Sequence, residues 1–114
     1  MAKRITLQEL RAKLEAGEKL LLLEALPRTS YEEVHLPGAL NLPLDELEEL
    51  APRLVPDRHA QIVVYCKDEA CRNSELAARR LRRLGYTNVR DYVGGKAEWI
   101  AAGLPVERGL AAAA

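Results

Sequence analysis

Apolar residues along this chain recur at two alternating spacings, one typical of helices and one typical of buried strands. Between Thr6 and Gly17, leucines recur every three or four residues. This spacing predicts a helix that begins with a Thr6 capping box and stops at Gly17. The runs Leu20–Glu24 and Ile62–Tyr65 are instead short, apolar and continuous. Such runs predict strands that are buried on both faces of a parallel sheet.

The rest of the chain continues this alternation. Further helices are predicted over residues 31–34, 44–54, 74–84 and 96–102, and further strands over 39–41 and 89–93. Alternating strands and helices predict an α/β fold with a mainly parallel sheet.

The longest predicted helix, over residues 74–84, has two distinct faces. Its apolar face carries Leu76, Ala77, Leu81 and Leu84, and its opposite face carries Arg79, Arg80, Arg82 and Arg83. We interpret the arginines as a solvated face near a helix C-terminus, where positive charge is favourable. A contact with an acidic partner is the alternative.

Composition narrows the class of protein. The length of 114 residues suits one domain over 1–114, with a core over about 5–107 and a C-terminal tail over 108–114 whose end, 111–114, is expected to fray. Acidic and basic residues balance at 17 each, which argues against a nucleic-acid binder.

No segment predicts a membrane or export signal. The longest apolar stretch, residues 20–23, is far shorter than the roughly 18 residues that span a bilayer. The basic start Met1–Arg4 is not followed by the apolar core of a signal peptide. We therefore expect a cytoplasmic protein.

In a reducing compartment, Cys66 and Cys71 are expected to be thiols rather than a structural disulfide. Neither His35 nor His59 has a ligand-like spacing to them, so no metal site is expected.

Cys66 directly follows the predicted strand 62–65 and precedes the longest helix. Ligands of parallel sheets bind at the carboxyl ends of strands, near the free N–H groups of the following helix. A loop curled around Cys66 would aim several amides at its sulfur, lower the thiol pKa and stabilise a thiolate or persulfide. On these residues alone, a buried and inert cysteine is an equally good interpretation.

Two groups of residues carry a resemblance to a known family. They are Tyr31-Glu-Glu-Val-His-Leu-Pro-Gly-Ala-Leu-Asn-Leu-Pro43, and Val64-Tyr-Cys66 with Ser74, Ala77-Ala78, Leu81, Gly85-Tyr86, Val89, Gly94-Gly95, Trp99 and Gly103-Leu-Pro105. Over about Ile5 to Glu107, the chain resembles single-domain rhodanese-like sulfurtransferases. The resemblance implies a five-stranded parallel sheet flanked by helices on both faces. It also implies an enzyme that carries sulfane sulfur as a persulfide on Cys66.

The resemblance implies one catalytic residue, Cys66, and an active-site loop that contacts the substrate. The loop residues are Lys67, Asp68, Glu69, Ala70, Cys71, Arg72 and Asn73. The implied partner is a small sulfur donor or a persulfide-bearing protein, with no metal or organic cofactor, no nucleic acid and no membrane. His35, Gly94, Gly95 and Trp99 are interpreted as structural, with His35 bonded to the backbone.

The loop departs from the family pattern. Arg72 lies six positions after Cys66, where the family usually has five, and the loop is expected to be about two residues longer than usual. Asp68 and Glu69 make it acidic, and a like charge within about 5 Å of a bound dianion costs on the order of 1 kcal/mol. Thiosulfate is therefore predicted to be a poor donor, and a persulfide a better one.

Three further interpretations depend on neighbouring residues. Cys71 either attacks a Cys66 persulfide or merely packs, so a non-catalytic or redox-sensing dithiol module is the alternative function. The spacing of Cys66 to Arg72 also matches a Cys-x5-Arg phosphatase, although the acidic loop disfavours phosphate. Glu24 and Arg28 are predicted to form an ion pair near the site.

Overall fold

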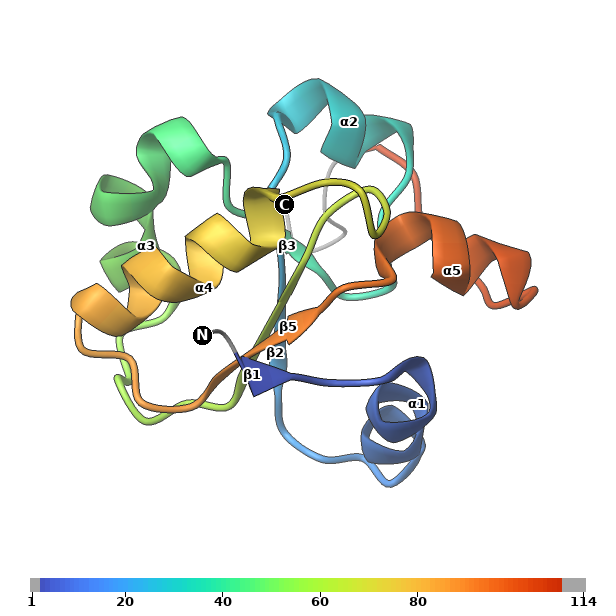
Figure 1. Ribbon diagram of the computed structural model, residues 1–114, viewed down its shortest axis with the longest axis horizontal. Coiled ribbons are helices and arrows are strands. Elements are labelled where there is room, and N and C mark those ends of the chain that lie inside the picture. Colours follow the sequence, from blue (N-terminus) through green and yellow to red (C-terminus); the bar gives the residue numbers. More distant parts are fainter. Residues whose placement is uncertain (1–2, 110–114) are drawn as a thin grey trace.

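The computed structural model describes residues 3–109 and arranges them as a parallel sheet between two layers of helices (Figure 1). The strands are β1 (Lys3–Arg4), β2 (Leu21–Glu24), β3 (Leu40–Asn41), β4 (Ile62–Tyr65) and β5 (Val89–Tyr92). Their order is β1-β5-β4-β2-β3, and every neighbouring pair is parallel. The expected five-stranded sheet is confirmed, whereas the tail predicted to fray, 111–114, lies outside the described residues.

Helices cover both faces of the sheet. They are α1 (Leu7–Glu15), α2 (Arg28–Glu33), the 3-10 turn η1 (Leu44–Glu46), α3 (Leu47–Leu54), α4 (Asn73–Arg83) and α5 (Gly95–Ala101). In Figure 1, α3 and α4 lie on one side of the sheet, and α1 and α5 lie on the other. Among the described helices, none combines the length and the apolar character that crossing a membrane requires.

The sheet separates two apolar cores because successive side chains of a strand point to opposite faces. On β4, Ile62 and Val64 face the α3 and α4 layer, and Val63 and Tyr65 face the α1 and α5 layer. All four side chains are completely buried. Burial of each such side chain stabilises the fold by about 1.5–3 kcal/mol, so β4 holds the residue that follows it in a fixed position.

Most predicted elements are confirmed to within one residue, and the differences have local causes. The helix predicted over 31–34 begins earlier, at Arg28, directly after Pro27. The helix predicted over 44–54 starts as η1 and becomes α-helical only at Leu47. Strand β1 was not predicted, because the exposed pair Lys3–Arg4 has no apolar pattern.

The two faces of α4 differ from the prediction. Its buried stripe is formed by Ala77, Ala78 and Leu81, whereas Leu76 is 42% exposed and does not belong to it. Arg79 and Arg83 are exposed, as predicted, whereas Arg80 is half-buried and donates to Glu48 at 2.7 Å and to the Leu44 carbonyl at 2.8 Å. These contacts fasten α4 to the η1 and α3 segment.

Candidate active site

Cys66 sits at the carboxyl end of the central strand β4 and is 1% exposed. The start of α5 holds this point of the chain, because the Lys96 N–H donates to the Cys66 carbonyl at 3.0 Å and the Ala97 N–H to the Lys67 carbonyl at 2.9 Å. Gly95 permits this approach, since a Cβ there would lie 2.4 Å from the Cys66 carbonyl oxygen. The base of the loop is therefore clamped against α5.

The sulfur of Cys66 faces the start of α4. Its thiol lies in donating geometry to the Cys71 carbonyl at 3.4 Å and to the Ser74 hydroxyl oxygen at 3.5 Å. Burial raises the pKa of the Cys66 thiol to about 11, and hydrogen bonding from Ser74 opposes that rise. The predicted lowering of the pKa is wrong, because the sequence around Cys66 does not show how completely the thiol is buried.

The loop amides are not all aimed at the sulfur. The N–H groups of Ala70 and Cys71 donate to the Asp68 carboxylate, each at 3.1 Å. The expected ring of amides around Cys66 is therefore wrong for these two groups. The Asp68 carboxylate thus occupies these two amides.

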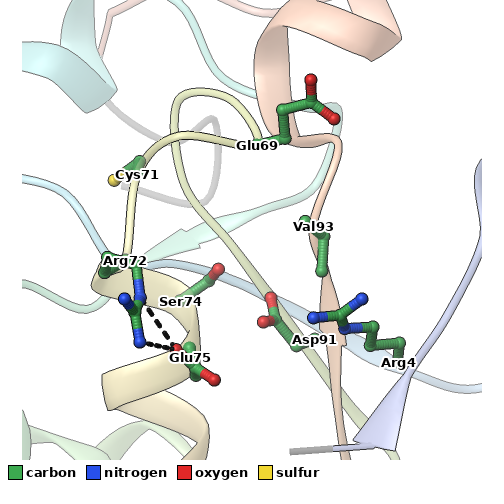
Figure 2. Close-up of a pocket in the computed structure, with 8 residues that line it drawn as sticks. All are labelled: Arg4, Glu69, Cys71, Arg72, Ser74, Glu75, Asp91 and Val93. Atoms are coloured by element: carbon green, nitrogen blue, oxygen red, sulfur yellow. Dashed lines mark hydrogen bonds and ion pairs between the residues drawn. The ribbon is translucent and has the colours of Figure 1, made fainter.

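Arg72 points along the helix surface rather than toward Cys66. Its guanidinium donates to a Glu75 carboxylate oxygen at 3.0 and 2.7 Å, and its side chain is 75% exposed. Figure 2 shows this pair at the edge of the pocket. In this geometry Arg72 does not clamp an anion on Cys66, as a Cys-x5-Arg phosphatase site would require.

The other loop residues take different positions. Lys67, Glu69 and Ala70 are exposed, whereas Asn73 donates to the Ala25 carbonyl at 3.0 Å and fixes the start of α4. Cys66 and the half-buried Cys71 are both free thiols. Within residues 3–109, no three His, Cys, Asp or Glu side chains gather as a metal site would need.

A pocket of about 560 Å³ lies beside the loop, between β1, β5 and α4 (Figure 2). Its lining residues are Arg4, Glu69, Cys71, Arg72, Ser74, Glu75, Asp91 and Val93. The sequence did not single out Arg4 or Asp91. The available signal was a carboxylate inside strand 89–93, where burial would be costly.

A buried ion pair lies behind the loop. The Glu24 carboxylate is 2.9 Å from the Lys96 ammonium and accepts the Tyr65 hydroxyl at 2.7 Å. The predicted partner Arg28 binds Glu32 instead, at 2.9 Å on the exposed surface of α2. The expected Glu24–Arg28 pair is therefore wrong, because the true partner comes from α5.

His35 bonds to the backbone, as predicted. It is buried, and its Nδ1 lies 2.7 Å from the Tyr31 carbonyl oxygen, with the two rings stacked 3.8 Å apart. The backbones of His35 and Glu107 exchange two hydrogen bonds of 2.9 Å. Trp99 is also buried and donates to the Pro105 carbonyl at 2.7 Å.

The sequence of this chain is similar to that of known proteins. The rhodanese-like domain family matches residues 6–102. The chain is 39% identical over 105 residues to the HTH-type transcriptional regulator Rv0324 of Mycobacterium tuberculosis, covering 92% of this chain and 45% of that protein. It is 32% identical over 95 residues to the putative sulfur carrier protein YrkF of Bacillus subtilis, covering 83% and 49%. The chain thus spans less than half the length of both relatives.

Among solved structures, the human single-domain sulfurtransferase TSTD1 superimposes with a TM-score of 0.76 at 31% identity. The match covers 89% of this chain and 97% of the human protein. The fold therefore agrees with that of a protein of similar size.

Proposed function

Because this chain belongs to the family of rhodanese-like domains, we propose that it is a sulfurtransferase whose Cys66 carries sulfane sulfur as a persulfide. The observation that supports this proposal is the placement of a free thiol at the end of the central strand, beside the first turn of α4. Cys71 and Ser74, whose oxygens the Cys66 thiol contacts, line a pocket with room for a small donor or the end of a partner's side chain.

The proposed reaction needs two displacements at sulfur. The Cys66 thiolate attacks the outer sulfur of the donor, so that a new S–S bond forms while the donor's own bond to that sulfur breaks. The leaving group takes the electron pair of the broken bond. An acceptor nucleophile then attacks the outer sulfur and releases the Cys66 thiolate. The cycle uses no metal and no organic cofactor.

Sulfur release by cyanide tests this function. The chain is loaded with thiosulfate, glutathione persulfide or cysteine persulfide, freed of donor and treated with cyanide, and thiocyanate is measured. We expect thiocyanate from the natural chain and from Cys71→Ala, and none from Cys66→Ala, because Cys66 carries the sulfur. Equal release from Cys66→Ala, or none from the natural chain with any donor, would contradict the proposal.

We propose a persulfide, on a protein or a small thiol, as the better donor. Asp68 already occupies the Ala70 and Cys71 amides, and Glu69 adds a second negative charge to the loop. A dianion such as thiosulfate has to approach both carboxylates. The likeness to a putative sulfur carrier protein agrees with a protein persulfide as donor or acceptor.

Removing the two loop carboxylates should improve thiosulfate use. In Asp68→Gly/Glu69→Gly, we expect kcat/KM for thiosulfate to rise about 30-fold, since two like charges near a dianion cost on the order of 1 kcal/mol each. The value for glutathione persulfide should change less. Glu15→Gln, on the exposed end of α1, is the control and should change neither. A natural chain as active with thiosulfate as a dedicated thiosulfate enzyme would contradict this prediction.

A redox-sensing module is the second candidate function. It is favoured by the likeness to a transcriptional regulator and by the contact of the Cys66 thiol with the Cys71 backbone. Treatment with peroxide would then give an intact chain lighter by two hydrogens, with the two cysteines joined. Oxidation that adds oxygen to Cys66 and leaves Cys71 reduced would exclude this dithiol function.

A further inference from the structure

Asp91 is a buried carboxyl group that the mechanism above does not use. It lies on β5, is 3% exposed, and its Oδ1 has no hydrogen-bond partner among the described residues. A buried polar atom without a partner is costly, so it needs a structural or chemical reason. The pocket beside the loop is lined by this side chain.

Ser74 connects Asp91 to the nucleophile. The Cys66 thiol donates toward the Ser74 oxygen at 3.5 Å, and Ser74 lies beside Asp91 in the lining of the same pocket, where it lowers the pKa of the Asp91 carboxyl. Ser74 is only 2% exposed and Asp91 3%, so both groups lie out of bulk water. In Figure 2, the Ser74 hydroxyl and the Asp91 carboxyl point into the same pocket from α4 and β5.

We propose that Asp91, acting through the Ser74 hydroxyl, accepts the proton of the Cys66 thiol while sulfur is transferred. This inference rests on the proposed function of Cys66 as the nucleophile. Asp91 acts on the thiol proton through Ser74, so it is a positioning residue.

The step balances with a persulfide donor. The proton of the Cys66 thiol passes to the Ser74 oxygen as the Ser74 proton passes to Asp91, and the freed electron pair forms the new S–S bond. The donor's S–S bond breaks, and its electron pair stays on the departing thiolate. That thiolate takes up the proton in the pocket that Asp91 lines, so Asp91 is a carboxylate again. A thiol and a persulfide are consumed, and a Cys66 persulfide and a thiol are formed.

Burial makes such a relay useful. With a thiol pKa of about 11, only roughly one chain in 10⁴ holds a thiolate at pH 7. Transfer to Asp91 moves the negative charge from one buried group to another. No additional charge is created in the pocket, so the desolvation penalty of a new buried anion is avoided.

The charged groups around Asp91 set its readiness as a base. Burial raises the pKa of its carboxyl, and hydrogen bonding from Ser74 lowers it. Glu75 on α4 raises the pKa of Asp91, and Arg4, which pairs with Asp91 from β1, lowers it. Glu69 and Arg72 from the loop also line the pocket. A carboxyl with a raised pKa is a better proton acceptor near neutral pH than an ordinary aspartate.

The test is the pH dependence of Cys66 alkylation in Asp91→Asn. Trypsin cuts after Lys67, so Cys66 and Cys71 fall in separate peptides and mass spectrometry follows each. With iodoacetamide at pH 7, we expect the Cys66 rate to fall about tenfold or more, and sulfur transfer about 100-fold. The decline of the natural chain's rate at acid pH, where Asp91 takes up a proton, should vanish in Asp91→Asn and return in Asp91→Glu.

Two further variants distinguish a proton relay from a bystander charge. Ser74→Ala should give the same loss as Asp91→Asn, and the double variant should be no slower than either, because both interrupt one relay. An unchanged or faster alkylation of Cys66 in Asp91→Asn would overturn the inference, since removal of a mere bystander charge eases thiolate formation. Alkylation needs no sulfur donor, so this result stands apart from the cyanide test of the proposed function.

Discussion

Replacing Lys96 by methionine is expected to lower the free energy of unfolding by about 3–5 kcal/mol. Lys96 is 6% exposed and lies 2.9 Å from the completely buried Glu24 carboxylate. Its ammonium also donates to the carbonyls of Ser30 and Val34, at 2.8 and 2.6 Å. Methionine keeps most of the apolar stem, so the loss reports the buried charge that is left without its cation. Urea unfolding at pH 7 measures it.

The loss should depend on pH with a definite sign. Burial raises the pKa of Glu24 above 4.5, and Lys96 lowers it. Without Lys96 the folded-state pKa rises further, so the folded variant binds a proton that the unfolded chain has released. Stability gained from that proton is full below the unfolded pKa and is lost as the pH rises through the folded pKa. The deficit of Lys96→Met should therefore be smaller at pH 4.5 than at pH 7.

The same substitution at an exposed pair is the control. Lys13 lies 3.1 Å from Glu18 on the surface, and Lys13→Met should cost less than about 1 kcal/mol. Lys96→Met combined with Glu24→Gln should cost less than the sum of the single changes, because no unpaired charge stays buried. Equal losses for Lys96→Met and Lys13→Met would show that the buried pair has no special weight.

The second large effect is expected at Gly95. In Gly95→Ala, the new Cβ would meet the Cys66 carbonyl oxygen at 2.4 Å, at a φ of +61° that L-residues rarely adopt. The backbone under the nucleophile has to move, and a displacement of about 1 Å can cost roughly 100-fold in rate. We expect sulfur transfer by Gly95→Ala to fall by about that factor, with a stability loss of roughly 2–4 kcal/mol.

Gly17→Ala separates conformational strain from the clash. Gly17 has a similar φ of +72°, but no atom lies within 4 Å of a Cβ placed there. Its substitution should cost about 1–2 kcal/mol from the φ strain alone and leave sulfur transfer unchanged. If Gly95→Ala behaved like Gly17→Ala in both measurements, the clamp between α5 and Cys66 would be unimportant for the site.

Local patterns were sufficient to predict most elements of the fold. We could predict β2 and β4 from their apolar runs, and α1 from its Thr6 cap. The burial and capping of these elements depend on residues that are near neighbours in the sequence. β1 escaped prediction because its two charged residues gain order only from pairing with β5.

The chemistry of the site was harder to predict because its contacts are long-range. Glu24 finds Lys96 across 72 positions of sequence, so a nearby cation such as Arg28 was the wrong choice. The pKa of the Cys66 thiol depends on burial between layers rather than on its neighbours in the loop. Asp91 lies near the site only because β5 pairs with β4 in the sheet, and the local sequence does not reveal that pairing.

The clamp at the base of the loop has a consequence for evolution. Hydrogen bonds from Lys96 and Ala97 fix the carbonyls of Cys66 and Lys67, whereas Asp68 and the two residues after Glu69 are held mainly by bonds among themselves. Under the proposed function, we expect mutations at positions 68–71 to alter donor preference while the nucleophile keeps its place. Donor preference and the position of the nucleophile could then change independently in evolution, and libraries randomised over 68–71 would test for new sulfur donors.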